Sequence, residues 1–287
     1  MNIMIATDGS SNSLACVDAL KTRPYGTDTV VHIISIYDTK DYVLPRKRLN
    51  KSQAEAAIRQ TVDSLKSSGC KLHSQLLQGE AAKLIIKTVS EIKPDMLFIG
   101  AHAPSSYFSP FLSNIAQTVL ENATCSVTVI KSLIGHKYGF TNKHLICADS
   151  TSGAADSWVY KLTHVWPNDG QFLLLNVIEP PINKGSENPK IDAQLFLAQT
   201  EEKRKKMFEL IEAQVQYFSK LFPRGRFEGR AIISLDVIET ILDTAKNQNV
   251  DLIIMSPHKR KGMDKFLSGS VSYEIARRAQ CSVEIVR

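Results

Sequence analysis

Residues Cys125–Lys131 read Cys-Ser-Val-Thr-Val-Ile-Lys, and residues Cys281–Arg287 read Cys-Ser-Val-Glu-Ile-Val-Arg. A second matching pair, Asp95–Gly100 and Asp251–Ser256, lies at the same separation of 156 residues (281 − 125 and 251 − 95). Both members of each pair are short apolar runs of the length of a β-strand. The chain therefore repeats itself over a long period.

The front of the chain repeats as well. Ile3–Ser10 returns as His144–Thr151, with Asp8 and Asp149 aligned 141 residues apart. The two separations differ by 15 residues (156 − 141), so the second copy contains about that many extra residues. This spacing indicates two long copies of one domain, not a short-period solenoid. We expect domains at residues 1–134 and 142–287, each large enough to bury its own core.

Composition gives no sign of a nucleic-acid or membrane protein. The 287 residues are 43% hydrophobic and 22% charged, with a formal net charge of +6. The basic run Lys203–Lys206 directly follows Glu201 and Glu202, which is typical of a solvated helix face. No apolar run approaches the ~20 residues of a spanning helix, and Asn2–Ala6 reads as a strand, not a signal peptide. We expect a cytoplasmic protein without nucleic-acid or membrane partners.

The five cysteines are scattered without CxxC spacing. Cys125, Cys147 and Cys281 stand in apolar, strand-like contexts and read as small buried hydrophobic residues in a reducing compartment. Cys70, beside Gly69, is expected to be the most exposed thiol.

Both copies alternate strand and helix patterns, which predicts parallel sheets covered by helices on both faces. The extra residues of the second copy read as a loop, because Pro180, Pro181, Gly185 and Pro189 lie there. A long helix is expected near Thr200–Phe222, with a buried stripe at Ile211, Val215, Phe218 and Phe222. The expected strands are Ile3–Thr7, Thr29–Ile36, His73–Leu77, Met96–Gly100 and Ser126–Lys131 in the first copy, and Leu145–Ala148, Gln171–Val177, Phe227–Ile233, Leu252–Met255 and Val283–Arg287 in the second.

Ligands of parallel sheets bind at the carboxyl ends of the strands, which directs attention to two loops. After the first strand, Asp8-Gly9-Ser10 precedes a helix. Glycine permits a tight turn, and the Asp8 carboxylate could accept hydrogen bonds from ribose hydroxyls or an adenine amine. The alternative is that Asp8 and Ser10 only cap the helix.

In the second copy, the loop that follows the fourth strand is basic. It begins at Ser256, contains His258–Lys261, and ends at Gly269-Ser270 before a helix. Glycine and hydroxyl groups at a helix N-terminus form a plausible seat for a phosphate. An exposed basic loop with an ordinary helix cap is the alternative.

The combination of these features resembles the universal stress protein family, over essentially the whole chain. Members of that family have an Asp-Gly-Ser-like turn after the first strand. Nucleotide-binding members carry Gly-x2-Gly-x9-Gly-(Ser/Thr) after the fourth strand, and a closing strand often entered through a Cys-Pro-Val-like sequence. The resemblance implies two five-stranded domains of strand order 3-2-1-4-5 packed as a pseudo-dimer, with the closing strands meeting at the pseudo-two-fold axis.

Neither copy keeps the whole phosphate motif. The second copy retains Gly269-Ser270, but Ser256 and Lys259 stand at the two earlier glycine positions. The first copy retains Gly100, while Ala103 takes the second position and Ser113-Asn114 the final pair. Its loop also contains Tyr107, Phe108 and Phe111, which either cover the core or shape an apolar surface for a ligand or partner.

The resemblance implies an adenine nucleotide, ATP with or without Mg²⁺, and favours the second copy. There Asp149 would hold the adenosine and Val177 would touch the base or ribose. Lys259 would pair with a phosphate or fill the space that glycine leaves open. The phosphates would lie on Gly269, Ser270, Val271 and Ser272, and Ser256 completes the set. The corresponding positions of the first copy are Asp8, Gly9, Ile36 and Gly100.

No catalytic residue is indicated by the sequence. The seven histidines lack metal-ligand spacing, and no nucleophile elbow, Walker loop or dinucleotide fingerprint occurs. His102 and His258 occupy equivalent loops and read as exposed loop residues. Three hypotheses remain: a nucleotide-responsive stress or signalling module, a scaffold whose altered loops bind a protein or apolar ligand, and an enzyme with slow ATP hydrolysis at most. A protein partner and a dimer of two such chains are further expectations.

Overall fold

The structure is a computed structural model of the 287-residue chain. It describes residues 1–38, 49–101, 112–131, 142–147, 169–180, 189–256 and 270–287, and within these the side chains of residues 189–194 are left undescribed.

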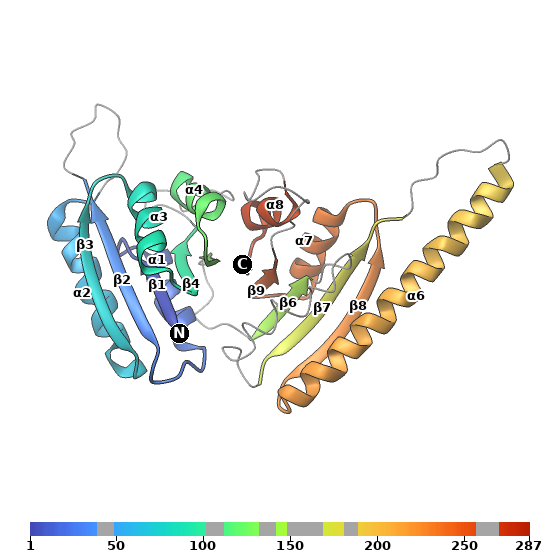
Figure 1. The fold of residues 1–287 in the computed structure, drawn as a ribbon, viewed down its shortest axis with the longest axis horizontal. Helices are drawn as coiled ribbons and strands as arrows, with labels where there is room; N and C mark the ends of the chain where they lie inside the picture. Colours follow the sequence, from blue (N-terminus) through green and yellow to red (C-terminus); the bar gives the residue numbers. More distant parts are fainter. Residues whose placement is uncertain (39–48, 102–111, 132–141, 148–168, 181–188, 257–269) are drawn as a thin grey trace.

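The described strands form one ten-stranded sheet in the order β3-β2-β1-β4-β5-β10-β9-β6-β7-β8. Read from its outer edge towards the middle, and with the strands numbered within each copy, each half has the order 3-2-1-4-5 expected from the family resemblance. Figure 1 shows the two halves side by side, with the C-terminus between them. The strands are β1 (Asn2–Ala6), β2 (Val30–Tyr37), β3 (Lys71–Gln78), β4 (Met96–Gly100), β5 (Ser126–Ile130), β6 (Lys143–Cys147), β7 (Gln171–Ile178), β8 (Arg226–Ile233), β9 (Leu252–Met255) and β10 (Ser282–Ile285).

All neighbouring strands within each half are parallel, and the halves join through the antiparallel pair β5 and β10. The closing strands of the two copies therefore meet, as predicted. Pairing hides two edges that would otherwise expose unsatisfied backbone groups.

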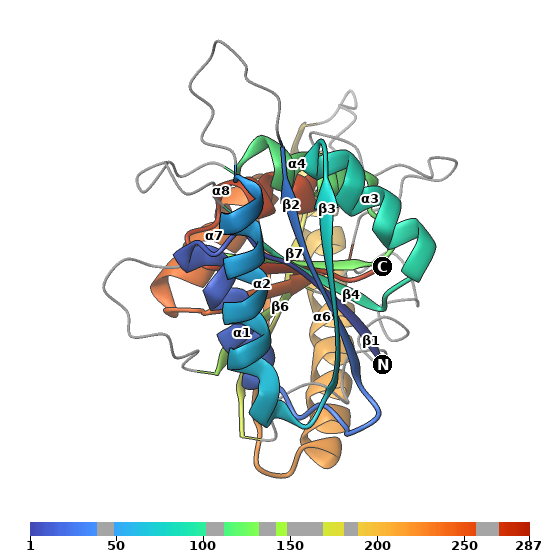
Figure 2. The ribbon, with the colours of Figure 1, turned by 90° about the vertical axis from the view of Figure 1, so that its left-hand side faces the viewer.

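Helices cover both faces of the sheet, and Figure 2 shows α1 and α2 on one side of the first half and α3 on the other. One apolar cluster packs under α1 (Ser11–Lys21), α2 (Lys51–Leu65) and α6 (Pro189–Leu221). The other packs under α3 (Ala81–Ile92), α4 (Asn114–Asn122), α7 (Val237–Asn247) and α8 (Val271–Arg278). Both clusters contain residues of both halves, so the core is continuous across the junction.

Local sequence explains where α2 begins and where its last turn ends. Asn50 accepts a hydrogen bond from Gln53 N, and the Gln53 side chain accepts one from Asn50 N, which is a capping box. A short 3₁₀ turn, Lys66–Ser68, follows α2 and ends at Gly69, whose φ of 76° is left-handed. Glycine adopts this conformation without strain, so Gly69 terminates the helical segment.

Helix α6 is longer than predicted. The expected start near Thr200 is wrong, because the helix begins at Pro189, which was assigned to a loop. Proline is compatible with the first turn of a helix, where its missing N–H would have no partner. The predicted stripe is confirmed for Ile211, Phe218 and Phe222, which are buried, and Val215 packs beside them.

Cys125, Cys147 and Cys281 are buried free thiols, and Cys70 is half-exposed, as the sequence predicted. Cys16 is a buried free thiol as well. Among the residues that the structure describes, no helix is long and apolar enough to cross a membrane. Nor does this part of the chain contain a group of three or more His, Cys, Asp or Glu that could hold a metal ion. The domain limits, 1–134 and 142–287, stay a prediction.

Candidate functional site

The carboxyl ends of β6 and β9 lie side by side in the second half. Cys147 pairs with Met255 in register, and Ser256 follows directly and is half-buried. Asp149 stands two residues beyond the end of β6, so the chain leaves these two strands at neighbouring points. Asp149 itself lies outside the described residues, as do Lys259 and Gly269.

Helix α8 begins beside this edge with Ser270 as its N-cap. The Ser270 Oγ accepts a hydrogen bond from Tyr273 N at 3.3 Å, and it lies 3.4 Å from Ser272 Oγ. Ser272 is 1% exposed, and Val271 packs against the core, so the first turn of α8 is held firmly. Two hydroxyls and the N–H groups of a first helical turn are the groups that bind anions in proteins.

The end of the second strand supplies an apolar wall in each half. Val177 in β7 and Ile36 in β2 are half-buried and pack against the same apolar cluster. Both strands extend past the neighbouring first strand, since Cys147 pairs with Leu175 and Ala6 pairs with Ile34. A flat apolar ring could rest on such a projecting strand end.

In the first half, the Asp8 carboxylate is hydrogen-bonded to the N-cap residue of α1. Its Oδ1 accepts hydrogen bonds from Ser10 N at 2.9 Å and Ser10 Oγ at 2.5 Å. Ser10 is the N-cap of α1 and accepts a hydrogen bond from Ser13 N. The capping interpretation of this turn therefore accounts for the observed contacts.

Gly9 and Gly100 also have packing reasons to be glycine. Gly9 has a φ of 74°, and a Cβ there would lie 3.3 Å from Ala57 Cβ. A Cβ on Gly100 would lie 2.9 Å from Asn12 Cβ, so the N-terminus of α1 approaches the end of β4 closely. These glycines thus need no ligand to explain them.

The helices after the phosphate loops differ by one residue at their starts. Their C-caps, Ala123 and Ala279, are 156 residues apart, whereas their N-caps, Ser113 and Ser270, are 157 apart. Ser113 accepts a hydrogen bond from Ala116 N at 3.2 Å and occupies the position that Gly269 holds in the second copy. The second copy therefore keeps glycine where the first copy has its capping side chain.

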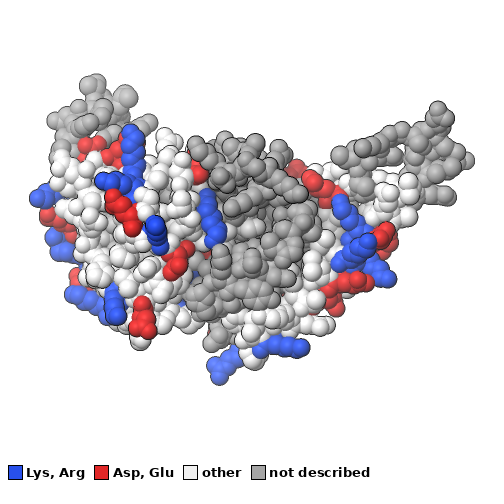
Figure 3. Space-filling view, in the orientation of Figure 1, with Lys and Arg blue, Asp and Glu red and all other residues white. Residues whose placement is uncertain are grey.

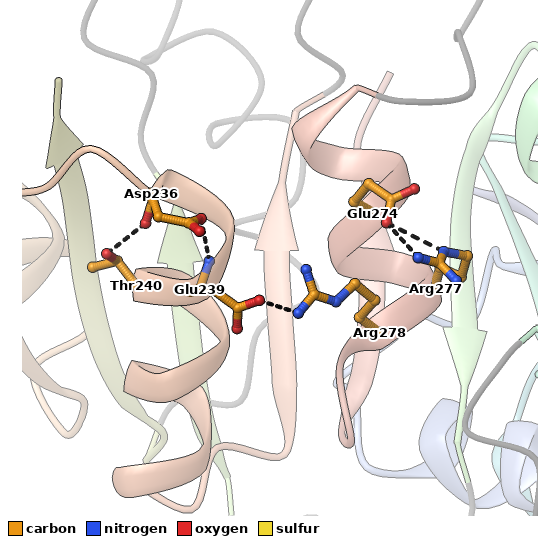
Figure 4. Close-up of polar contacts among 6 residues, drawn as sticks. All are labelled: Asp236, Glu239, Thr240, Glu274, Arg277 and Arg278. Atoms are coloured by element: carbon orange, nitrogen blue, oxygen red, sulfur yellow. Dashed lines mark hydrogen bonds and ion pairs between the residues drawn. The ribbon is translucent and has the colours of Figure 1, made fainter.

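Charges near α8 are used to join it to α7, as Figure 4 shows. Arg278 forms an ion pair with Glu239 of α7, and Glu274 accepts a hydrogen bond from Arg277 at 2.7 Å. Asp236 caps α7 by accepting from Glu239 N at 2.9 Å. On the face in Figure 3, the described Lys and Arg residues are interspersed with Asp and Glu. The Arg278–Glu239 ion pair thus joins the last turn of α8 to the first turn of α7.

Sequence reasoning missed a cluster of buried hydroxyl groups in the first half, next to the turn that joins β1 to α1. Thr61 donates to Thr7 Oγ1 at 3.1 Å, and Thr7 donates to Ser13 Oγ at 3.3 Å; all three are buried. Only Thr61 carried a signal in the sequence, because helical spacing places it with Ala54 and Leu65 on the buried face of α2. The other predicted loop residues, including His102, His258 and the aromatic trio Tyr107, Phe108 and Phe111, lie outside the described residues.

Comparison with known proteins finds the same two-copy organisation. The chain matches the Universal stress protein family over residues 1–131 and again over residues 144–287. It belongs to the universal stress protein family. A universal stress protein of Methanocaldococcus jannaschii is 27% identical over 137 residues, which are 45% of this chain and 81% of that protein.

Two solved structures match over nearly the whole universal stress protein chain. One, a universal stress protein of Archaeoglobus fulgidus, has a TM-score of 0.65 and 16% identity, with 100% of this chain and 98% of that chain covered. The other, a Pseudomonas aeruginosa protein, has a TM-score of 0.62 and 13% identity, with 99% and 92% covered. At these identities the likeness shows the tandem fold alone.

Proposed function

We propose that this universal stress protein binds an adenine nucleotide, ATP with Mg²⁺, in its second domain, and that binding regulates a partner without a catalytic cycle. The observation that carries the proposal is the first turn of α8. It stands beside the joined ends of β6 and β9, begins with Ser270, and follows the retained Gly269.

The residues that the sequence singles out offer a partner for each part of such a ligand. The Ser270 and Ser272 hydroxyls and the first N–H groups of α8 would hold phosphate oxygens. Val177 would support the base or ribose, and Asp149 would accept from the adenosine. Lys259, within the basic run that follows Ser256, would bring positive charge to the phosphates. The nucleotide itself supplies the charge and bulk that would order this side of the second domain.

The first domain is proposed to act as a scaffold. The Asp8 carboxylate already accepts hydrogen bonds from Ser10, and Gly100 lies too close to Asn12 for a side chain. Ser113 stands where the motif has its terminal glycine. Each of these features stabilises the domain without a ligand.

The two N-caps provide a matched pair of variants. Ser270→Ala and Ser113→Ala each remove a cap of similar geometry, which costs about 1 kcal/mol of stability in either domain. Only Ser270→Ala removes a phosphate ligand in the proposal. We expect it to raise the dissociation constant of a fluorescent ATP analogue roughly tenfold, the effect of one hydrogen bond to a charged group. The Ser113→Ala protein should bind as the wild type does.

Two results would contradict this assignment. One is equal weakening by both variants, which would indicate a general effect of stability. The other is weakening by Ser113→Ala alone, which would move the site to the first domain. A wild-type protein that binds no nucleotide would instead favour the scaffold hypothesis for the whole chain.

A further inference from the structure

The junction between the two domains is centred on one pair of residues. Thr128 of β5 lies directly opposite Glu284 of β10 in the antiparallel register. These two positions are also equivalent in the repeat, 156 residues apart. The pseudo-two-fold axis that relates the domains therefore passes through this pair.

The contacts on either side of the axis obey the symmetry. Arg287 N donates to Ser126 Oγ at 3.1 Å, and Lys131 N donates to Ser282 Oγ at 3.2 Å. The side chains of the same two residues also cross the junction, but to carbonyls at non-equivalent positions: Lys131 Nζ donates to Ala279 O at 2.5 Å, and an Arg287 nitrogen donates to Cys125 O at 3.1 Å. Because Ser126 and Ser282 are equivalent, as are the N–H groups of Lys131 and Arg287, the two backbone-to-serine contacts would form equally well between two identical domains.

The pair on the axis breaks that symmetry. Glu284 is fully buried, and its Oε2 accepts a hydrogen bond from Thr128 Oγ1 at 2.9 Å. The same oxygen forms an ion pair with Arg23, which follows α1 in the first domain. The Arg23 guanidinium is itself largely buried and lies 5.4 Å from the centre of the Phe98 ring. The buried carboxylate of the second domain is thus neutralised by the first domain.

Identical domains could not reproduce this arrangement. Two second domains joined through β10 would place two buried Glu284 carboxylates opposite each other, a strongly unfavourable pair of like charges. The position of the second copy that corresponds to Arg23, 141 residues later, holds His164. Two first domains joined through β5 would oppose two Thr128 side chains and leave each Arg23 buried without a carboxylate.

We propose that the β5–β10 junction is a heterotypic interface, at which a first domain accepts only a second domain, of its own chain or of another copy, and each domain rejects its own kind. Glu284 in β10 and Arg23 in the first domain are the residues that set this specificity. This inference is independent of nucleotide binding.

Cleavage of the intact, folded chain tests it. A protease site is placed within residues 132–141, and the protease cuts the peptide link between the two domains after the chain has folded. Native mass spectrometry then distinguishes first–second, first–first and second–second pairs by their masses. The cleaved wild type should remain a complex of one first and one second domain. After exchange in mild denaturant and dilution, mixed pairs should exceed like pairs by roughly a hundredfold or more, the effect of one unpaired buried charge.

Two variants sharpen the result. Glu284→Thr removes the opposed carboxylates, so pairs of two second domains should appear. Glu228→Thr removes an exposed glutamate of the outer strand β8 and should leave the distribution unchanged. Like pairs as abundant as mixed pairs in the wild type would overturn the proposal, and so would the absence of second–second pairs in Glu284→Thr.

Dilution of the cleaved complex, never exposed to denaturant, gives a measurement that does not depend on refolding. Arg23→Met should raise the dissociation constant of the two domains roughly a hundredfold or more, because Glu284 stays buried without its cation. An unchanged constant, or wild-type domains that separate on cleavage, would also overturn the proposal.

Discussion

At the scale of single residues, equivalent positions in the two domains show what each environment demands. Ile3 in β1 corresponds to His144 in β6, and both are buried. The His144 ring stacks on Phe172 with 4.9 Å between centroids. Burial, and secondarily the charge of Arg23, lower the pKa of His144 to about 3. Neither ring nitrogen has a hydrogen-bond partner among the described residues.

This histidine should make the protein sensitive to acid. Its pKa in the folded state lies below the ordinary 6.5, so the unfolded state binds the proton more tightly. The free energy of unfolding should therefore decrease as the pH falls from about 6.5 towards about 3. His144→Ile, which installs the residue of the first domain, should remove this dependence. It should also stabilise the protein by about 1–3 kcal/mol at pH 5, because no buried nitrogen is left unsatisfied.

Urea unfolding at pH 7 and pH 5 measures both effects. The informative quantity is the difference between wild type and variant at each pH, because other groups that titrate in this range contribute to both proteins. A difference that does not change with pH would contradict the low pKa of His144.

Single residues were predictable only where local sequence carries the reason. Gly69 ends a helix by its own backbone freedom, and Cys125 and Cys281 lie in apolar runs that become buried strands. His144 and Glu284 stand in runs of the same kind, yet their partners come from sequence-distant elements. Strand patterns predict burial of such polar residues but not the group that balances them.

At the scale of elements, α6 distinguishes the second domain from the first. It spans 33 residues where α2 spans 15, and its buried face packs on the edge strand β8. Close packing requires a glycine at position 229, since a Cβ there would overlap Ile211 Cγ2. The branch of the isoleucine fills the space left by the absent side chain.

This contact predicts a matched rescue. Gly229→Ala should destabilise the protein by about 1–3 kcal/mol, the usual cost of an overfilled core. Ile211→Leu, which lacks the β-branch, should cost less than about 1.5 kcal/mol alone. In the double variant the overlap is removed, so it should be more stable than Gly229→Ala. Chemical denaturation of the four proteins tests the coupling, and strictly additive losses would argue against this close contact.

Elements were the part of the fold that the sequence predicted best. Met96–Gly100 and Leu252–Met255 were predicted to the residue, and the remaining described strands differ by one or two residues at one or both ends. The start of α6 was missed because prolines near a turn-rich segment favour a loop, although Pro189 is acceptable in the first turn of a helix.

At the scale of the whole molecule, the two domains share one sheet and two cores. Val127 of β5 and Ile285 of β10 lie in one apolar cluster, and Ile130 and Val286 lie in the other. The reciprocal contacts of Lys131 and Arg287 add hydrogen bonds across the junction. Separating the domains would expose both clusters and the buried pair of Arg23 and Glu284.

The molecule should therefore unfold as a unit. We expect a single transition in scanning calorimetry, with equal calorimetric and van't Hoff enthalpies. Arg23→Met should weaken the junction and split the transition, because Glu284 would stay buried without its cation and the two halves would be less strongly coupled. Two resolved transitions in the wild type would contradict the strong coupling of the domains.

The family resemblance predicted the strand order, and the matching closing strands of the two copies predicted the meeting of β5 with β10. The ligand site was less predictable, because each copy retains a different part of the phosphate motif. In the first domain, the contacts of Asp8 agree with the capping alternative that the sequence left open, and Gly100 has a packing role that the motif could not reveal. The site residues of the second domain remain predictions that only binding measurements can test.

Calorimetric titration of Mg²⁺-ATP into the purified protein, with Gly269→Glu as the control, tests the nucleotide proposal most directly. We predict micromolar binding at about one site per chain in the wild type and no binding in the variant, whose carboxylate would repel the phosphates beside α8. No heat of binding in the wild type, together with no nucleotide released on denaturation of the purified protein, would contradict the account.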